Sequence, residues 1–224
     1  MSKFQKEPVK LVPVPSTNKI PERDIDKSPI LECRHLGIDF GGLTAVEDFN
    51  MAIGRTEIAG LIGPNGAGKT TVFNLLTKVY QPTRGTILVD GHDTAGKSTI
   101  QVSHMGIART FQNIRLFKEL TVMDNVLIGL HHEMDYRLAG AILRLPSYWR
   151  GERIARERAM ELLGIFDMQD MADYKAGSLP YGAQRRLEIV RALATGPSLL
   201  LLDEPAAGMN PSETAELMDN IVKI

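Results

Sequence analysis

The sequence of 224 residues predicts an α/β fold: a parallel α/β core, an antiparallel β-rich segment before it, and a helical insert within it. Three observations support this prediction. The stretches "ILECRHLGIDF", "TAVEDFNMAI" and "TEIAGLIG" have the alternating or continuous apolar residues of strands. The run "LLLLDEP" is typical of a strand buried in a parallel sheet. Between these regions, residues 114–174 have the apolar spacing of helices.

The composition is that of an ordinary globular protein, with 43% hydrophobic and 24% charged residues. A formal net charge of −1 gives no reason to expect a nucleic acid partner. A single cysteine, Cys33, excludes an internal disulfide and fits a reducing compartment. The sequence has neither an apolar run of about 20 residues nor the apolar core of a signal peptide. We therefore expect a cytoplasmic protein.

The elements of the first half follow in order. Residues 1–29 are rich in Pro and Lys and lack periodic apolar residues, so we expect a flexible tail. The predicted domain, 30–224, begins with the three strand candidates. A helix, "KTTVFNLLTKVY", comes next and is closed by "QPTRG", and "TILVDG" is a further strand that ends in a turn.

The second half begins with the helical insert, predicted at 113–180. Its segment "LTVMDNVLIGL" has Thr121 as a helix N-cap, and the charges of "RGERIARER" are expected on a solvated helix face. The stretch "SLPYGAQRRLEIVRAL" then combines a glycine turn with a helix. After "LLLLDEP", the last predicted helix starts at Pro211.

The stretch "GPNGAGKT" fits the P-loop pattern G-x-x-x-x-G-K-[ST] and lies between a predicted strand and a predicted helix. Its glycines allow backbone N–H groups to turn toward phosphate oxygens. Lys69 would supply positive charge to the β- and γ-phosphates, Thr70 would bind Mg²⁺, and Thr71 would donate to the α-phosphate region. The alternative, a glycine turn with a chance lysine, is disfavoured by the full pattern. The predicted nucleotide-binding residues are Gly63, Pro64, Asn65, Gly66, Ala67, Gly68, Lys69, Thr70 and Thr71.

A carboxylate pair, Asp203 and Glu204, ends the "LLLL" run. Alone, such a pair is a common solvated turn. Together with a P-loop upstream, it predicts a site in which Asp203 reaches the metal ion and Glu204 polarises the attacking water.

The helix after "LPYG" starts with basic residues, although the positive end of the helix macrodipole favours anionic ones. An anion that arrives from outside would explain this, but one turn and one helix do not demonstrate it. Arg185 and Arg186 would strengthen the local positive field, or would contact solvent or pack within the insert; both alternatives remain open.

The stretch "LPYGAQRR" just ahead of "LLLLDEP" resembles the LSGGQ-type signature of ABC ATPases, and the resemblance covers nearly the whole chain from Ile30. It implies an ABC-type P-loop domain that binds ATP and Mg²⁺. By this resemblance, Gln112 in "ARTFQN" is the Q-loop glutamine, a metal ligand with a catalytic role. Phe40 matches the aromatic residue that stacks on adenine, Val46 also contacts the nucleotide, and Asn210 lies in the D-loop.

Family members close head to tail, so that the signature of one subunit meets the γ-phosphate on the P-loop of the other. The predicted signature residues are Leu179, Pro180, Tyr181, Gly182, Ala183 and Gln184. Pro180 stands where the family has serine, and it offers neither a hydroxyl nor an N–H group. Ala183 stands where the family has glutamine. We therefore expect the contact in trans to depend on Gly182, the amides after it and the helix dipole.

Longer segments, such as "GIARTFQNIRLFKELTVMDNVLIGLH" and "YGAQRRLEIVRALATGPSLLLLDEPAAGMNPSE", look like the LivG-type ATP-binding subunits of branched-chain amino acid importers. The resemblance implies a second ATP-binding subunit, in a homodimer or a heterodimer, two membrane permeases and, indirectly, a periplasmic solute-binding protein. It places the chain peripherally on the cytoplasmic face of the bacterial inner membrane. The segment "IRLFKELTVMDNV" would lie by the groove for the permease's coupling helix.

ABC ATPases carry a switch histidine on a strand beyond the D-loop, and no histidine of this sequence follows Asp203. We therefore expect a C-terminally incomplete domain without the switch region, and weak hydrolysis. The adjacent His131 and His132 are expected to face solvent in a loop. The histidines are His35, His92, His104, His131 and His132.

Other functions remain open. Within the family, the alternatives are another importer and an envelope lipid exporter. A soluble ABC ATPase that acts on nucleic acid or ribosomes usually has tandem domains and a basic surface, whereas this chain has one P-loop and a net charge near zero. A GTPase would carry an N-K-x-D base reader, which this sequence lacks.

Overall fold

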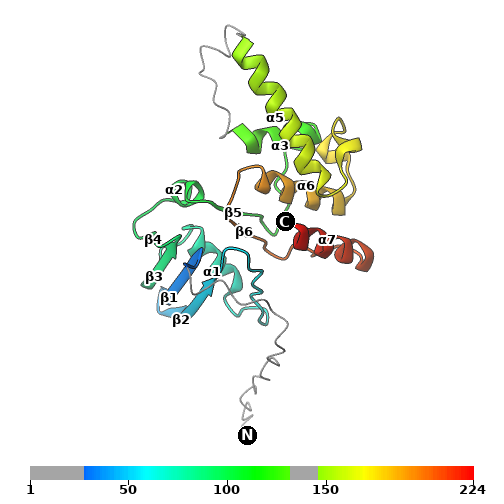
Figure 1. Cartoon of the computed structure of the whole chain (residues 1–224). Coiled ribbons are helices and arrows are strands. Elements are labelled where there is room, and N and C mark those ends of the chain that lie inside the picture. Colours follow the sequence, from blue (N-terminus) through cyan, green and yellow to red (C-terminus); the bar gives the residue numbers. More distant parts are fainter. Residues whose placement is uncertain (1–27, 132–145) are drawn as a thin grey trace, which may run out of the picture.

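The computed structural model describes residues 28–131 and 146–224. Figure 1 shows two packed parts, one built on an antiparallel sheet and one built from helices. The parallel strands β5 (Ile107–Arg109) and β6 (Leu199–Leu201) lie between these parts. The predicted α/β class, with an antiparallel β region and a helical region, is confirmed.

The antiparallel sheet has the strand order β2-β1-β3-β4. Its central strand places Leu31 opposite Ile53 on one side and Val89 on the other, and all three side chains are buried. Burying apolar residues on one face is what holds such a sheet to its core. The strands are β1 (Leu31–Phe40), β2 (Leu43–Ile53), β3 (Arg84–Val89) and β4 (His92–Asp93).

Helix α1 (Lys69–Leu76) packs into the same core as the sheet, through Val72, Leu75 and Leu76. These positions share one helix face because of their spacing. Two elements that the sequence did not predict follow: the six-residue helix α2 (Thr99–His104) and the three-residue strand β5. Both are too short to show apolar periodicity.

The helical part has a core of its own. Helix α3 (Val122–Leu130) starts at Thr121, whose side chain accepts from the Asp124 amide in a capping box, so the predicted N-cap is confirmed. Two short 3₁₀ helices lie between α5 and α6. The other elements are α5 (Pro146–Gly164), η3 (Gln169–Met171), η4 (Ala176–Ser178), α6 (Tyr181–Leu193) and α7 (Pro211–Lys223).

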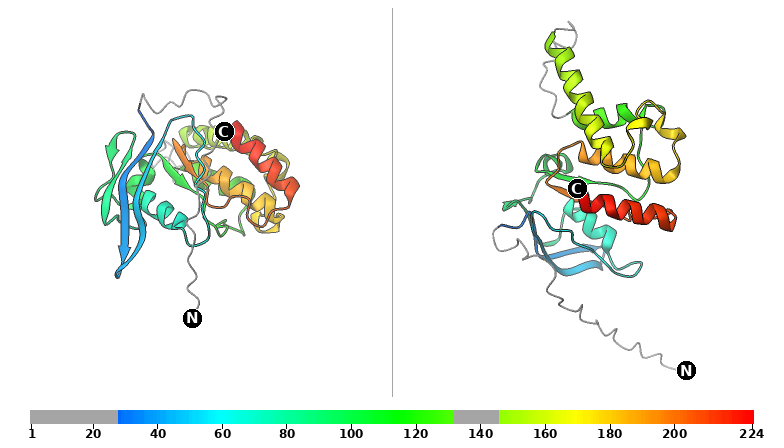
Figure 2. Two further views of the ribbon diagram at one scale, coloured as in Figure 1. Left: turned by 90° about the horizontal axis from the view of Figure 1, so that it is seen from below. Right: turned by 45° about the vertical axis from the view of Figure 1, so that its right-hand side comes forward.

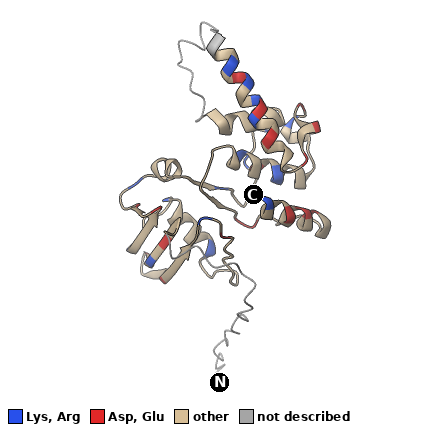
Figure 3. Cartoon of the chain, viewed as in Figure 1, with Lys and Arg blue, Asp and Glu red and all other residues tan. Residues whose placement is uncertain are grey.

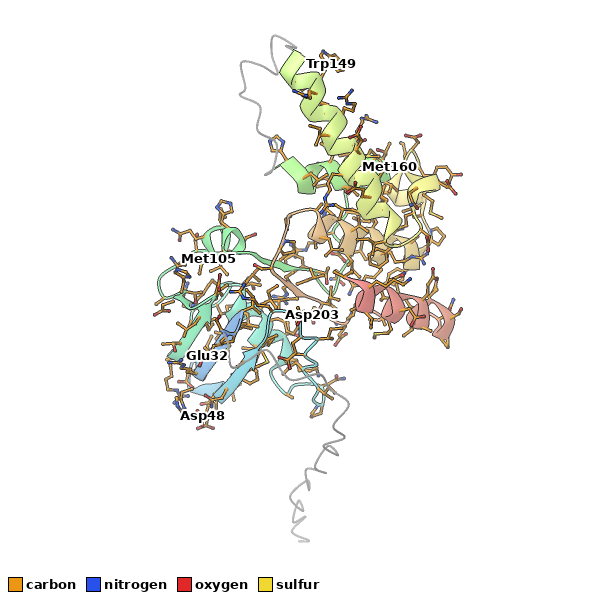
Figure 4. All side chains as sticks on the ribbon, in the orientation of Figure 1. Glu32, Asp48, Met105, Trp149, Met160 and Asp203 are labelled. Atoms are coloured by element: carbon orange, nitrogen blue, oxygen red, sulfur yellow. The ribbon has the colours of Figure 1, made fainter. Side chains whose placement is uncertain are left out.

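Strand β6 joins the two cores. Leu199 and Leu201 are buried among the side chains of the sheet part, whereas Leu200 and Leu202 pack against the helical core. This alternation follows from the period of two in a strand. The carboxyl end of β6 therefore lies between the two parts, where Figure 4 labels Asp203.

One predicted strand is absent. Residues 56–63, "TEIAGLIG", have no strand pairing with any described residue, and Ile58 and Ile62 are 68% and 95% exposed. A strand needs hydrogen-bonded neighbours, and apolar periodicity alone does not supply them. The prediction of a strand here is wrong.

Other expectations have mixed outcomes. The predicted tail lies almost wholly outside the described residues, as does His132, whereas His131 is exposed as predicted. The helical core continues past residue 180 through α6 and includes Leu217 of α7. An insert at 113–180 stays a prediction.

Helix α5 extends away from the rest of the chain (Figure 2), with Trp149 near its far end (Figure 4). Positions of both charge signs alternate along its ribbon (Figure 3), and the side chains of the pair Arg158 and Glu161 are exposed, so the predicted solvated face is confirmed. Among the described helices, none is both long enough and apolar enough to cross a membrane.

Candidate functional site

The P-loop leads directly into helix α1. Gly68, just before the helix, has φ +83°, and a Cβ placed there would lie 2.7 Å from the Ala45 carbonyl oxygen. The residue must therefore be glycine, both for its left-handed backbone and for its close approach to β2. Gly66 also has a positive φ of 81°, but a Cβ there would meet no atom within 4 Å. The loop is thus fixed against the sheet at one end and open at its tip.

The N-terminus of α1 has neither a side-chain cap nor an acidic residue in its first turn. The first amides of a helix have no intrahelical acceptor, and the macrodipole makes this end positive. Lys69 adds an ammonium group that donates to the carbonyl oxygens of Gly63 and Pro64 at 2.7 and 2.9 Å. This end of the helix is suited to phosphate.

The carboxylate of Asp203 lies two residues after the end of β6, and its side chain is 9% exposed. Arg109, at the end of the parallel strand β5, donates to its Oδ2 atom at 2.8 Å. The same guanidinium donates to Asn74 Oδ1 of α1 at 2.7 Å. Arg109 therefore connects the predicted metal ligand with the P-loop helix.

Gln112 and Glu204 are exposed neighbours, since Gln112 Nε2 donates to Glu204 Oε2 at 3.1 Å. Glu204 has φ +48°, an uncommon conformation for a residue with a side chain. The predicted Q-loop glutamine and the predicted base are thus brought together, and their roles stay predictions.

A cavity of about 450 Å³ brings the two predicted motifs to one place. It is lined by Lys69 of the P-loop and by Asp203 and Glu204 of the carboxylate pair. Lys69 and Asp203 are 134 residues apart in the sequence, and they come together because the P-loop helix and β6 pack in the same core.

Of the other two predicted nucleotide contacts, Val46 lies against the P-loop and Phe40 lies at the end of β1. Val46 is buried, and its Cγ2 atom would be 3.3 Å from a Cβ at Gly68. Phe40 is half exposed and makes an edge-to-face contact with Tyr80, with ring centroids 5.2 Å apart. Phe40 therefore presents an aromatic surface to solvent at the end of β1.

The predicted signature lies at the start of α6, with Pro180 at the N-cap position and no acidic residue in the first turn. The helix start is nevertheless not free of anions. A Cβ on Gly182 would lie 2.6 Å from Glu213 Oε1 of α7. Glu213 also accepts from the Asn210 amide at 3.0 Å, so the predicted D-loop residue is the N-cap of α7. The sequence analysis missed this carboxylate, because α7 is distant in sequence.

The two arginines of α6 differ. Arg185 is fully buried and pairs with Glu188 at 2.8 Å, so of the alternatives left open for it, solvent contact is excluded and packing agrees with the structure. Arg186 pairs with the exposed Glu216 at 2.7 Å. The spacing of Arg185 and Glu188, one helical turn apart, was the available signal for a pair.

A P-loop that opens a helix, together with carboxylates at the end of a parallel strand, defines the class of P-loop nucleotide-binding domains. A family model described as "ABC transporter" matches residues 46–207. This chain is 45% identical to the high-affinity branched-chain amino acid transport ATP-binding protein BraF of Pseudomonas aeruginosa, covering 88% of the chain and 77% of BraF. It is 46% identical to LivG of Escherichia coli K12 over the same shares of both proteins.

Two solved structures agree with this. The ADP conformation of MJ1267, an ATP-binding cassette of an ABC transporter, is 29% identical with a TM-score of 0.74, covering 87% of this chain and 76% of MJ1267. The structure of cbiO1 from Clostridium perfringens, part of the ABC transporter complex cbiONQ, is 27% identical with a TM-score of 0.74, covering 88% of this chain and 73% of cbiO1. The chain belongs to the ABC transporter family, and it is an ATPase whose hydrolysis is coupled to transport.

Proposed function

We propose that this chain is the ATP-binding and hydrolysing subunit of a membrane transporter that imports branched-chain amino acids. The observation that carries this proposal is the identity of 45% and 46% to the two ATP-binding subunits named for that transport, over 88% of the chain. The complete P-loop and carboxylate pair support the activity itself.

The residues present fit MgATP. The open tip of the P-loop, the uncapped start of α1 and Lys69 supply amides and positive charge for the β- and γ-phosphates. Among the described residues, no group of three or more His, Cys, Asp or Glu could hold a metal ion. Thr70, Asp203 and Gln112 would therefore share Mg²⁺ with phosphate oxygens, as Mg²⁺ prefers. When bound, Mg²⁺ neutralises the charge that develops on the transferred phosphoryl group.

The chain's own residues divide the remaining work. Glu204 would accept a proton from the attacking water, or would orient that water toward the γ-phosphorus. Gln112, held beside Glu204 at 3.1 Å, would orient the water or the metal ion. Phe40 would stack on adenine, since its ring is half exposed at the end of β1.

A second ATP-binding subunit, either identical or related, would complete the site. Its signature, residues 179–184, would meet the γ-phosphate in trans. Pro180 contributes no N–H group, so the amides of the first turn of α6 and the helix dipole would bind the anion. The negative charge of Glu213, next to Gly182, would oppose the phosphate unless the phosphate approaches from another side or the carboxylate moves.

A hollow of about 470 Å³ between the sheet part and the helical part supports docking of a permease. Its lining includes the exposed side chains of Phe111, Phe117 and Ile128. Phe117 lies within the segment "IRLFKELTVMDNV", which was assigned to the coupling-helix groove, and Phe111 and Ile128 flank that segment. The chain would then lie peripherally on the cytoplasmic face of the inner membrane, with a periplasmic solute-binding protein as an indirect partner.

The substitution Glu204→Gln tests the activity. We expect unchanged ATP affinity and a fall in hydrolysis of about 10²- to 10⁴-fold, the range for loss of a general base. Binding of a fluorescent ATP analogue and phosphate release measure the two quantities. The control Glu161→Gln, on the exposed face of α5, should change neither. Unchanged hydrolysis in Glu204→Gln would contradict the role of Glu204.

Uptake of labelled leucine by vesicles with the full set of subunits tests the proposed substrate. Uptake of another solute, with no leucine uptake, would contradict the proposed substrate and leave the ATPase activity intact.

A further inference from the structure

Arg185 of α6 is the largest of the fully buried side chains among the described residues. All five of its N–H groups have an acceptor, which is the full donor capacity of a guanidinium. The acceptors are Phe111 O, Glu188 Oε2 at 2.8 Å, Asp203 O at 2.9 Å, Glu204 O at 3.0 Å and Pro205 O at 3.3 Å.

These acceptors belong to the two loops that carry the predicted catalytic groups. Phe111 directly precedes Gln112 in the loop after β5. The carbonyls of Asp203 and Glu204 lie in the turn after β6, where Glu204 has its positive φ. Arg185 therefore bonds to the backbone on both sides of the Gln112–Glu204 contact.

Glu188, one turn further along α6, completes the arrangement. It is 2% exposed, accepts from Arg185, and its Oε1 atom accepts from the Arg115 amide at 3.3 Å. The loop from Phe111 to Arg115 is therefore attached to α6 at both ends.

Helix α6 also carries the predicted signature, and Gly182 precedes Arg185 by three residues, less than one turn. A helix moves as a rigid element, so a displacement of its first turn would displace the guanidinium as well. A planar guanidinium fixes five acceptors in one geometry, whereas a lysine ammonium donates three bonds from a single atom.

We propose that Arg185 is a positioning residue that sets the placement of Gln112 relative to Glu204 and couples it to the position of the signature turn. Arg185 touches neither nucleotide nor water in this role. The catalytic part of the proposal rests on the proposed function of Glu204, whereas the structural coupling does not.

The substitution Arg185→Lys tests the coupling by amide hydrogen exchange in the full chain, and Arg186→Lys, in the same helix turn, is the matched control. The Ala207 amide donates to Glu204 O at 3.1 Å and so reports on the turn after β6. In Arg185→Lys we expect the amides of Arg115 and Ala207 to exchange roughly tenfold faster, the effect of losing one hydrogen bond to a charged group. The amide of Val72 in α1 should keep its rate, and so should all three amides in Arg186→Lys.

A second variant makes the test specific. In Glu188→Gln, the Arg115 amide should exchange faster than in the wild type, while the Ala207 amide changes less, because Glu188 accepts directly from the first loop but reaches the second loop only through Arg185. This variant also carries the test if Arg185→Lys does not fold. Equal acceleration at Arg115, Ala207 and Val72 would overturn the proposal, since it would mean a loss of stability throughout. Unchanged exchange at Arg115 and Ala207 would overturn it as well.

Kinetics complete the experiment. We expect kcat for ATP hydrolysis to fall roughly tenfold in Arg185→Lys with KM unchanged, again the effect of one lost hydrogen bond of this kind. A raised KM with unchanged kcat would overturn the positioning role. Absence of hydrolysis in the wild type would contradict the proposed function instead, and the exchange pattern would still decide the coupling.

Discussion

The starts of α1 and α6 are two helix N-termini that share a sequence pattern and differ in their surroundings. Both follow or contain glycine, and neither has a side-chain cap or an acidic residue in its first turn. At α1 the loop tip is open, and Lys69 points back onto the loop's carbonyls. At α6 the carboxylate of Glu213 lies against Gly182.

An uncapped helix start is therefore not automatically an open anion site. The P-loop needs no other segment to present its amides to solvent, because its own left-handed glycines turn the backbone. Pro180 leads into the signature with φ −55° and ψ 154°, and Gly182 lies against Glu213 of α7. An anion at α6 therefore meets a carboxylate beside the first turn of the helix, whereas the P-loop glycines before α1 have no carboxylate against them.

The largest effect is expected from Gly68→Ala, which tests the fixed end of the P-loop. An alanine here would have to adopt a left-handed backbone, and its Cβ would lie 2.7 Å from the carbonyl oxygen of Ala45, which is part of a strand and cannot move aside. We expect a loss of about 3 kcal/mol in the free energy of unfolding, from conformational strain and overpacking together. Urea denaturation measures it. In the control Gly66→Ala, with open space around the Cβ, only strain of about 1 kcal/mol is expected. Equal losses would contradict a fixed end and an open tip.

A smaller effect is expected from Gly182→Ala. Here the obstacle is the end of a flexible side chain, so Glu213 can leave its capping position at a cost of about 1 kcal/mol. In a Glu213→Ala background, the same substitution should cost nothing further. A double-mutant cycle by urea denaturation measures this coupling. Additive losses would mean that Glu213 does not occupy the space over Gly182. The cycle also separates this contact from any effect on ATP-driven dimerisation.

The smallest effect is expected at Cys33, which reports on the core that holds α1. Burial raises the pKa of this thiol to about 12, so the folded chain should react slowly with a maleimide at pH 8. The thiol has a higher pKa in the folded chain than in the unfolded chain. Labelling of the folded chain therefore stays slow at pH values below this pKa and becomes faster as the pH rises toward 12. Gly182→Ala should leave the labelling rate unchanged, because α6 lies in the other core. Fast labelling in that variant would mean that a change at α6 alters the packing around Cys33 in the folded chain.

Much of this fold follows from local patterns. The loose alternation of apolar residues in β1 and the continuous apolar run of β6 each predict a strand in its actual surroundings. The spacing of glycine, lysine and threonine predicts the P-loop. Residues 56–63 have the same apolar content without a partner strand, because pairing is a property of the neighbours and not of the segment. Arg185 was ambiguous for a related reason: its acceptors are mostly backbone carbonyls, and a carbonyl leaves no mark in a sequence. Glu213 was missed because α7 is brought to Gly182 only by tertiary packing.

The two-sided packing of β6 has a consequence for how the protein unfolds. Leu199 and Leu201 belong to one core and Leu200 and Leu202 to the other, so neither core can open without exposing residues of the same strand. Exposing these leucines would remove buried apolar area and so weaken the core that is still folded. The sheet part and the helical part should therefore melt in one cooperative transition rather than as two independent units.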